Sequence, residues 1–235
     1  MNLSKRLEAV AGMVSFGHRL ADIGTDHGYV PIYLVEAGKV PSAVAMDINK
    51  GPLKKAEENV KRHHLEASIQ LRLSDGLAKL HPNEADTVLI AGMGGNLMSR
   101  IIADGQEQLK NVSELILQPQ SEIREFRHFL HNSGYKICEE EMLIDEGKYY
   151  VMFKAVKGTQ KYASEVEYAY GSLLLQKKHP VLRRYIEKEL RNYDTILKHL
   201  TDSDSIHAKT REKVLLEKSA LGKEALKYYD MPSTY

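Results

Sequence analysis

Residues 20–28 of the chain, LADIGTDHG, join a short apolar run to a segment of helical pattern that begins near Val30. Glycines at such a turn allow the backbone to approach a ligand closely. Asp47 ends the next apolar run, and a carboxylate at that place can accept hydrogen bonds from both hydroxyls of a ribose. These two features predict a nucleoside cofactor, and by themselves they fit NAD and S-adenosylmethionine equally well.

On both sides of this loop the chain alternates apolar runs with amphipathic segments, as far as residue 157. Apolar runs of this kind predict buried parallel strands, and the segments between them predict crossover helices. The expected strands are residues 20–24, 43–47, 69–73, 87–91 and 115–118, and the expected helices are residues 3–16, 30–37, 52–64, 96–110 and 121–132.

A β-hairpin is expected at the end of this region. Residues 135–144 and 148–156 have strand patterns, and Asp145-Glu146-Gly147 between them is a turn sequence. A parallel sheet that finishes in an antiparallel hairpin, with its last strand inserted into the sheet, is typical of class I methyltransferases and unusual in dehydrogenases. The predicted fold of residues 1–157 is therefore an α/β, Rossmann-like methyltransferase sheet.

The loop itself also favours S-adenosylmethionine over NAD. The three-glycine dinucleotide fingerprint is missing, because only Gly24 and Gly28 are present. Asp26 would repel a pyrophosphate by about 4 kcal/mol at intermediate dielectric, whereas S-adenosylmethionine has no phosphate and carries an ammonium and a sulfonium. The expected cofactor-binding residues are Asp22, Gly24, Asp26, Gly28, Asp47, Ile48, Asp75, Gly76 and Gly92.

Two of these carboxylates have alternative roles. Asp75 follows the third apolar run, where it can accept a hydrogen bond from the adenine amino group or, like Ser74 before it, cap a helix. Asp22 can contact the cofactor or cap the amides of the loop.

The composition sets limits on partners. A net charge of +1 does not indicate nucleic-acid binding. Residues 158–235 contain 14 basic and 11 acidic residues, which fit either RNA contact or a solvated helical surface. Cys138 is the only cysteine, so no disulfide framework or cysteine metal cluster is expected. Without a signal peptide or a membrane-length apolar run, the protein is expected to be cytoplasmic. The sequence leaves its oligomeric state open.

Residues 158–235 are expected to form a separate helical domain. Pro180 suits the first turn of a helix, and residues 201–205 (TDSDS) suit a turn that supplies cap residues to a second helix. The pattern predicts an antiparallel, coiled-coil-like helical hairpin. Its apolar stripes are Leu182, Ile186, Leu190, Tyr193, Leu197 and Leu200 in the first helix, and Val214, Leu221, Ala225 and Tyr228 in the second.

Two blocks of sequence are more specific than the general pattern. Residues 22–31 (DIGTDHGYVP) and 90–95 (IAGMGG), together with 46–47, 51–53 and 74–77, closely resemble the bacterial tRNA adenine N1-methyltransferases of the TrmK family. The resemblance covers the whole chain, including the hairpin and the helical tail. It implies an S-adenosylmethionine-dependent enzyme that methylates N1 of adenine 22 in tRNA.

The residues agree with that chemistry. Enzymes that methylate exocyclic amines carry Asp/Asn-Pro-Pro-aromatic after the fourth strand, where this chain has Gly92-Met93-Gly94-Gly95. Cys138 lies in the expected hairpin, so it is expected in the core rather than acting as a nucleophile. Adenine N1 needs neither device, because its lone pair attacks the methyl group directly, and alignment and electrostatics then decide the rate.

The expected catalytic residues are Asp26, His27, Tyr29 and Met93, and Gln118 and Gln120 are further candidates for contact with the base. His27 and Tyr29 have simpler alternative roles, in loop stabilisation and packing. The densest basic stretch gives the expected tRNA phosphate contacts, which are Lys177, Lys178, Arg183, Arg184, Lys188 and Arg191.

Two other functions also fit parts of the sequence. One is a small-molecule methyltransferase that uses the helical tail as a lid. The other is a non-catalytic RNA-binding protein with a vestigial cofactor pocket, against which the intact acidic and glycine positions of the loop argue.

Overall fold

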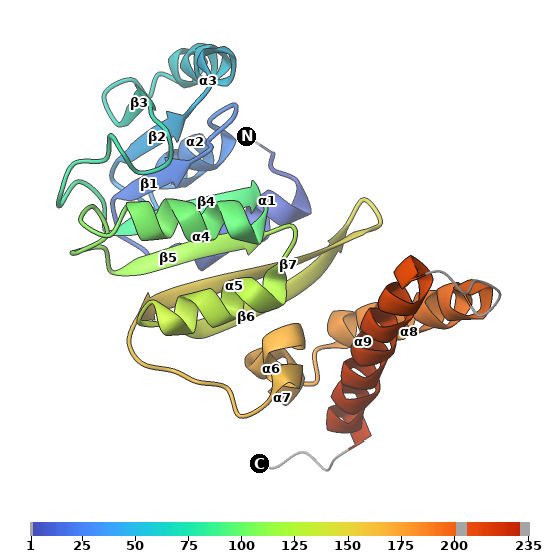
Figure 1. Ribbon diagram of the computed structural model, residues 1–235. Coiled ribbons are helices and arrows are strands. Elements are labelled where there is room, and N and C mark those ends of the chain that lie inside the picture. Colours follow the sequence, from blue (N-terminus) through green and yellow to red (C-terminus); the bar gives the residue numbers. More distant parts are fainter. Residues whose placement is uncertain (1, 201–205, 231–235) are drawn as a thin grey trace. The chain divides into compact units, whose positions relative to one another are not determined.

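The computed structural model describes residues 2–200 and 206–230. The chain divides into two compact units, with the boundary between Gln160 and Lys161. The sequence placed this boundary between residues 157 and 158. The first unit contains the sheet, and the regular elements of the second unit are all helices within its described residues, 161–200 and 206–230 (Figure 1).

The sheet of the first unit has seven strands in the order β3-β2-β1-β4-β5-β7-β6. The first five strands along the chain pair in parallel, and β7 lies antiparallel between β5 and β6. The predicted Rossmann-like sheet with an inserted last strand is therefore confirmed. The strands are β1 (Leu20–Ile23), β2 (Ala43–Asp47), β3 (Ile69–Leu73), β4 (Thr87–Met93), β5 (Glu114–Pro119), β6 (Tyr135–Asp145) and β7 (Lys148–Lys157).

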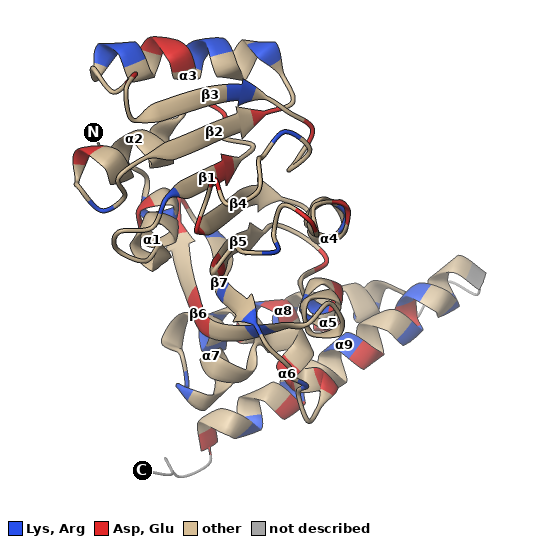
Figure 2. Ribbon diagram, turned by 90° about the vertical axis from the view of Figure 1, so that its left-hand side faces the viewer, with Lys and Arg blue, Asp and Glu red and all other residues tan. Residues whose placement is uncertain are grey.

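Helices cover both faces of this sheet, with α1 and α2 on one face and α4 and α5 on the other (Figures 1 and 2). The helices are α1 (Lys5–Met13), α2 (Tyr29–Glu36), α3 (Lys50–Arg62), α4 (Gly95–Asp104) and α5 (Ile123–Asn132). Helix α4 ends earlier than the expected residue 110, because Gly105 caps it. A Cβ at Gly105 would lie 2.3 Å from Leu77 Cδ1, so the chain turns there in tight contact with the loop after β3.

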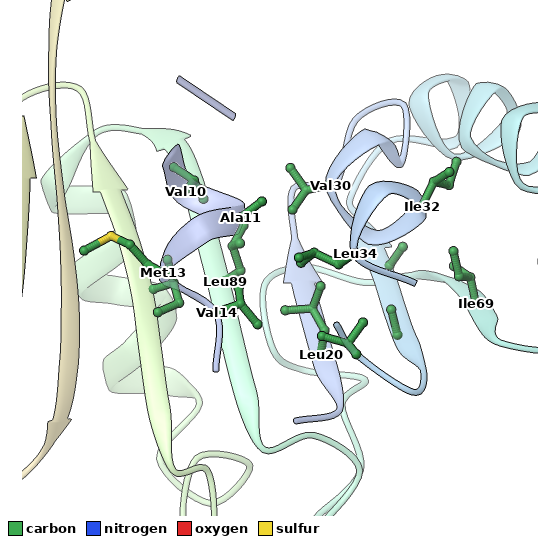
Figure 3. Close-up of a cluster of buried hydrophobic side chains, with 14 of the residues drawn as sticks. Val10, Ala11, Met13, Val14, Leu20, Val30, Ile32, Leu34, Ile69 and Leu89 are labelled. Carbon is green, nitrogen blue, oxygen red and sulfur yellow. The ribbon is translucent and has the colours of Figure 1, made fainter. Parts of the chain in front are cut away.

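One cluster of core side chains lies between α1, α2 and the sheet. Val10 and Ala11 of α1 and Leu34 of α2 are fully buried against Leu20 and Leu89 of the central strands (Figure 3). Every residue of β1, β2 and β5 is buried, as expected for apolar strands covered on both faces. The rigid centre of the sheet thus fixes the ends of the strands that carry the predicted site.

The second unit consists of α6 (Glu165–Tyr170), α7 (Ser172–Gln176), α8 (Pro180–Leu200) and α9 (Ile206–Asp230). Helices α8 and α9 pack antiparallel: the Tyr229 hydroxyl donates to the carbonyl of His179 (2.9 Å), while Gly222 lies against Leu190. Pro180 begins α8 as predicted, and the expected turn at residues 201–205 lies outside the described residues.

The predicted stripe of α9 is wrong in part. Val214 is 46% exposed, and Leu221 and Tyr228 are only half-buried. The buried face is offset and consists mainly of small residues, which allow the helices to approach closely. Its members are Ala208, Leu215, Ser219, Gly222 and Ala225.

The prediction that Cys138 lies in the core is also wrong, because this residue is exposed. It lies in β6 as expected, but Tyr135 and Ile137 point into the core and Cys138 alternates to the outer face.

Candidate active site

The carboxyl ends of β1, β2, β3 and β4 meet at one edge of the sheet, where parallel α/β folds bind their ligands. The registers pair Ile23 with both Met46 and Ile90, so the loops after β1, β2 and β4 begin side by side. Figure 2 shows acidic residues at the ends of β1 and β2 along this edge. All nine predicted cofactor residues belong to the ends of these strands or the loops that follow them.

The loop after β1 is fixed by its neighbours. The amides of Gly24 and Thr25 both donate to the carbonyl of Met46, at 2.8 and 2.9 Å. Gly24 has a φ of +73°, and a Cβ there would lie 2.2 Å from Met93 Cε. The glycine therefore allows close contact with Met93 of β4. Gly28, also at a φ of +73°, precedes the first turn of α2.

Asp22 lies beneath this loop rather than on its surface. It is 4% exposed, and the Thr25 hydroxyl donates to its Oδ2 at 2.6 Å. Burial raises the pKa of Asp22 to about 7, because a carboxylate loses its hydration there, and the Thr25 hydrogen bond opposes the shift only in part. The Asp22 carboxylate therefore contacts the loop through the Thr25 hydroxyl, and the capping of the loop amides that the sequence left open stays a prediction.

This raised pKa predicts a pH-dependent stability. The unfolded chain loses the Asp22 proton near its ordinary pKa of 3.8, whereas the folded protein holds it to about pH 7. The free energy of unfolding therefore falls as the pH rises between these values. We expect Asp22→Asn, which stays neutral, to be more stable than the wild type at about pH 8, with a smaller difference at about pH 5.

Chemical denaturation without cofactor at both pH values measures this difference. A stability difference that is the same at both pH values would show that Asp22 is ionised throughout.

Asp47 of β2 stands at the centre of the edge. It is 8% exposed, its Oδ1 accepts from the Asn49 amide at 2.8 Å, and its Oδ2 accepts from the Asp26 amide at 3.3 Å. Each carboxylate oxygen keeps a further lone pair. The carboxylate is therefore oriented by two amides and retains the capacity to accept two ribose hydroxyls.

Asp26, His27 and Tyr29 form a cluster in which Asp26 and Tyr29 are exposed and His27 is half-buried. Asp26 has a φ of +52°, its side chain is 68% exposed, and its Oδ1 lies 3.3 Å from His27 Nε2. The rings of His27 and Tyr29 are 5.4 Å apart. Asn59 donates to the backbone carbonyl of His27 at 2.9 Å, which holds the peptide and leaves the three side chains at the loop surface.

Ser74 and Asp75 in the loop after β3 could each cap a helix, and Asp75 could instead accept a hydrogen bond from the adenine amino group. Ser74 is buried, its hydroxyl donates to the carbonyl of Gly76 (3.0 Å), and it accepts from the Lys79 amide (3.1 Å). No α-helix begins there. Asp75 is exposed, and its carboxylate has no partner among the described residues. Its carboxylate is available to an amine.

An apolar surface accompanies these carboxylates. Ile48, directly after Asp47, is 59% exposed, and Leu73 at the end of β3 is 45% exposed. An aliphatic side chain beside a ribose-binding carboxylate suits the flat face of an adenine, and Asp75 suits its amino group. These residues fit the adenosine half of S-adenosylmethionine.

The ends of β4 and β5 form the other half of the edge. Gln118 is fully buried, its Oε1 accepts from Arg6 Nη1 (2.9 Å), and its Nε2 donates to the carbonyl of Pro119 (3.0 Å). The amide of Gln118 is therefore engaged within the protein, so Gln120, which is exposed, is the better candidate for contact with a base. Arg6 was not singled out by the sequence, because no local pattern links it to β5.

The six predicted phosphate contacts all lie in the second unit. Lys177 and Lys178 follow α7, and the others lie on α8. Arg183 is engaged, because its Nε donates to Glu187 at 3.0 Å and its guanidinium lies 5.7 Å from the centre of the Tyr229 ring. Arg184 and Arg191 are exposed.

Two further features of the described residues bear on the site. Residues 2–200 and 206–230 contain no group of three or more His, Cys, Asp or Glu side chains placed to hold a metal ion. No helix in the same ranges is both long and apolar enough to cross a membrane.

Comparisons with known proteins show the family of the chain. The family model of TrmK, tRNA (adenine(22)-N(1))-methyltransferase, matches residues 20–223. The Bacillus subtilis tRNA (adenine(22)-N(1))-methyltransferase is 32% identical, over 96% of this chain and 98% of that protein.

Two solved structures contain a cofactor or its product. Streptococcus pneumoniae Sp1610 in complex with S-adenosyl-L-methionine is 36% identical with a TM-score of 0.87, over 96% of this chain and 100% of that one. M. capricolum TrmK in complex with S-adenosyl-homocysteine is 27% identical with a TM-score of 0.83, over 96% of this chain and 98% of that one. The chain belongs to the TrmK family of tRNA (adenine(22)-N(1))-methyltransferases.

Proposed function

We propose that this protein transfers the methyl group of S-adenosylmethionine to N1 of adenine 22 in tRNA, at the strand-end edge of its first unit. The observation that carries the assignment to this edge is the loop after β1, which contacts Met93 of β4 and Asp47 of β2 at once. The proposal extends to the cytoplasm as the place of action, because the substrate is tRNA.

The cofactor would be held along the edge. Asp47 would accept hydrogen bonds from the ribose hydroxyls, Ile48 would pack on the adenine, and Asp75 would accept a hydrogen bond from the adenine amino group. The other expected cofactor residues would form the loops and allow the backbone to approach the cofactor closely. S-adenosylmethionine supplies an electrophilic methyl group on its sulfonium. Asp26 lies at the loop surface, where its carboxylate faces either the ammonium of the methionine end or the positive charge that develops on the adenine.

No protein base is needed, because N1 of adenine attacks with its own lone pair. His27, Tyr29 and Met93 contact and align the base, and Gln120 donates or accepts a hydrogen bond at its edge. The target base is normally stacked in folded tRNA, so the nucleotide must leave its stack to reach the edge.

Incubation of the purified protein with a tRNA transcript and isotopically labelled S-adenosylmethionine, followed by mass analysis of the digested RNA, tests this function. We expect 1-methyladenosine at position 22, and no label in a transcript with guanine at that position. Absence of label in both transcripts would favour a small-molecule methyltransferase, and cofactor-independent tRNA binding would favour a non-catalytic protein.

We predict that Asp26→Asn lowers the rate of methyl transfer by at least about tenfold, or about 1.4 kcal/mol of transition-state stabilisation. Asparagine tolerates the positive φ of this position, and the Asp26 side chain is mostly exposed, so the fold should be unaffected. Single-turnover kinetics and calorimetry separate the roles: weaker cofactor binding with normal turnover indicates contact with the ammonium, and the reverse indicates stabilisation of the base.

Asp104→Asn removes an exposed carboxylate at the last residue of α4 and is the matched control for this variant. Normal cofactor affinity together with a normal single-turnover rate in Asp26→Asn would leave Asp26 a structural residue of the loop.

We also propose that the helical unit binds tRNA through the exposed cations of α8. Arg184, Lys188 and Arg191 recur at helical spacing and are exposed. We expect the double variant Arg184→Ala/Arg191→Ala to bind tRNA more weakly. The slope of the logarithm of the association constant against the logarithm of the salt concentration should fall in magnitude by about 2, one for each lost phosphate contact.

Filter binding at several salt concentrations measures this slope. Arg183→Ala is the control at the neighbouring position, and its effect should be smaller than that of Arg184→Ala, because Arg183 is engaged with Glu187. A wild-type slope in the double variant would contradict an RNA role for α8.

A further inference from the structure

Arg6 brings a positive charge from α1 to the ends of β4 and β5. Its backbone amide donates to Asp145 Oδ2 at 3.1 Å, and its guanidinium lies 5.5 Å from the centre of the Tyr150 ring. One nitrogen, Nη1, donates to Gln118 Oε1 at 2.9 Å. The same atom lies 3.7 Å from the position that a Cβ of Gly92 would occupy. That Cβ position is also 3.6 Å from Gln120 Nε2.

The charge of Arg6 is not neutralised by an ion pair with any described residue. Four other arginines face a carboxylate at 2.6–3.0 Å, namely Arg19, Arg72, Arg127 and Arg183. Arg6 has no ion pair with any residue in the described ranges, and its partner Gln118 is a neutral amide. A half-buried guanidinium with one of its five donors used retains a fork that matches an oxyanion.

We propose that Arg6 is an oxyanion-binding residue of the methyl-transfer edge, which takes a carboxylate or a phosphate above Gly92. The inference rests on the proposed function, under which two such groups reach this edge. One is the carboxylate at the methionine end of the cofactor, and the other is the phosphate of the nucleotide that presents its adenine. Gly92 leaves the space between Arg6 and Gln120 free of a side chain.

Calorimetry and kinetics on Arg6→Ala distinguish the two sources. For a carboxylate, we expect the affinity for S-adenosylmethionine to fall about tenfold or more, while that for methylthioadenosine, which lacks the amino-acid portion, stays unchanged. For a phosphate, we expect cofactor affinity to hold and the KM for a tRNA transcript to rise about tenfold or more. Changes below about twofold in all three measurements would overturn the proposal.

Gln118→Glu separates anion binding from a merely structural link between α1 and β5. A carboxylate at position 118 would pair with Arg6 and keep α1 attached, although it loses the hydrogen bond to the Pro119 carbonyl. We therefore expect a folded variant in which the same affinity or KM changes as in Arg6→Ala. Unchanged affinity and KM in this variant would contradict the proposal even if Arg6→Ala failed to fold.

Two controls complete the design. Lys5→Ala removes an exposed cation from the same helix and should change nothing. Arg6→Lys, which keeps the charge but loses the fork, should restore part of the loss. The cofactor measurements need no tRNA, so they test the carboxylate source even if the wild type fails to methylate the transcript.

Discussion

Asp47→Ala is expected to weaken the binding of S-adenosylmethionine by about 1.5–3 kcal/mol, the value of hydrogen bonds to a charged group. This corresponds to about tenfold to about 150-fold in the dissociation constant. The Asp47 carboxylate is held by the amides of Asp26 and Asn49, so it is oriented before the ribose arrives. Titration calorimetry on the folded variant measures the loss.

Asp47→Asn gives a graded version of the same test. It keeps one acceptor oxygen, so its affinity should lie between those of the wild type and Asp47→Ala. Asp47→Asn leaves one backbone amide without its acceptor and Asp47→Ala leaves two, so the unfolding midpoints of both variants must be compared with that of the wild type. Unchanged affinity in a folded Asp47→Ala protein would exclude the ribose-binding role.

Arg127→Met is expected to lower the free energy of unfolding by about 3–5 kcal/mol. Arg127 and Glu140 form a buried ion pair with side chains 1% and 0% exposed, and Arg127 Nη2 lies 2.9 Å from Glu140 Oε1. The guanidinium also lies 4.7 Å from the centre of the Phe153 ring. Loss of the arginine removes the cation that lies 2.9 Å from a fully buried carboxylate, which is costlier than loss of the whole pair.

The double variant Arg127→Met/Glu140→Leu is therefore expected to recover most of that loss. Urea denaturation of the three proteins measures the difference. Lys61→Met breaks the exposed pair with Glu57 and should leave the midpoint nearly unchanged. A double variant no more stable than Arg127→Met would show that packing around α5, rather than the unpaired charge, causes the loss.

The sheet was predictable from the sequence because its signals are local. The strands β1, β2 and β5 are buried along their whole length, so apolar residues form the greater part of each. The loop after β1 and the residue that ends β2 follow such runs directly, and parallel pairing then brings them to one edge. Position along the chain was enough to place Asp26 and Asp47 near each other.

Other features depend on contacts that local patterns do not carry. The buried face of α9 was predicted wrongly because Ser219 and Gly222, which are both buried, add little apolar character. A Cβ at Gly222 would lie 3.0 Å from Leu190 of α8, so the close approach of the two helices favours a small residue there. The exposure of Cys138 did have a signal, since it alternates with the buried Tyr135 and Ile137. Arg6 had none, because its partner Gln118 is 112 residues away.

The long reach of α1 bears on how the chain acquires its structure. The Arg6 amide bonds to Asp145 across 139 residues, and β7 must enter between β5 and β6, both of which precede it in the sequence. Contacts of such high sequence separation form slowly, because a long loop must close before they stabilise anything. On a ribosome, α1 therefore cannot dock fully until the hairpin has emerged, and a nascent chain that ends before β7 lacks the methyl-transfer edge in its finished form.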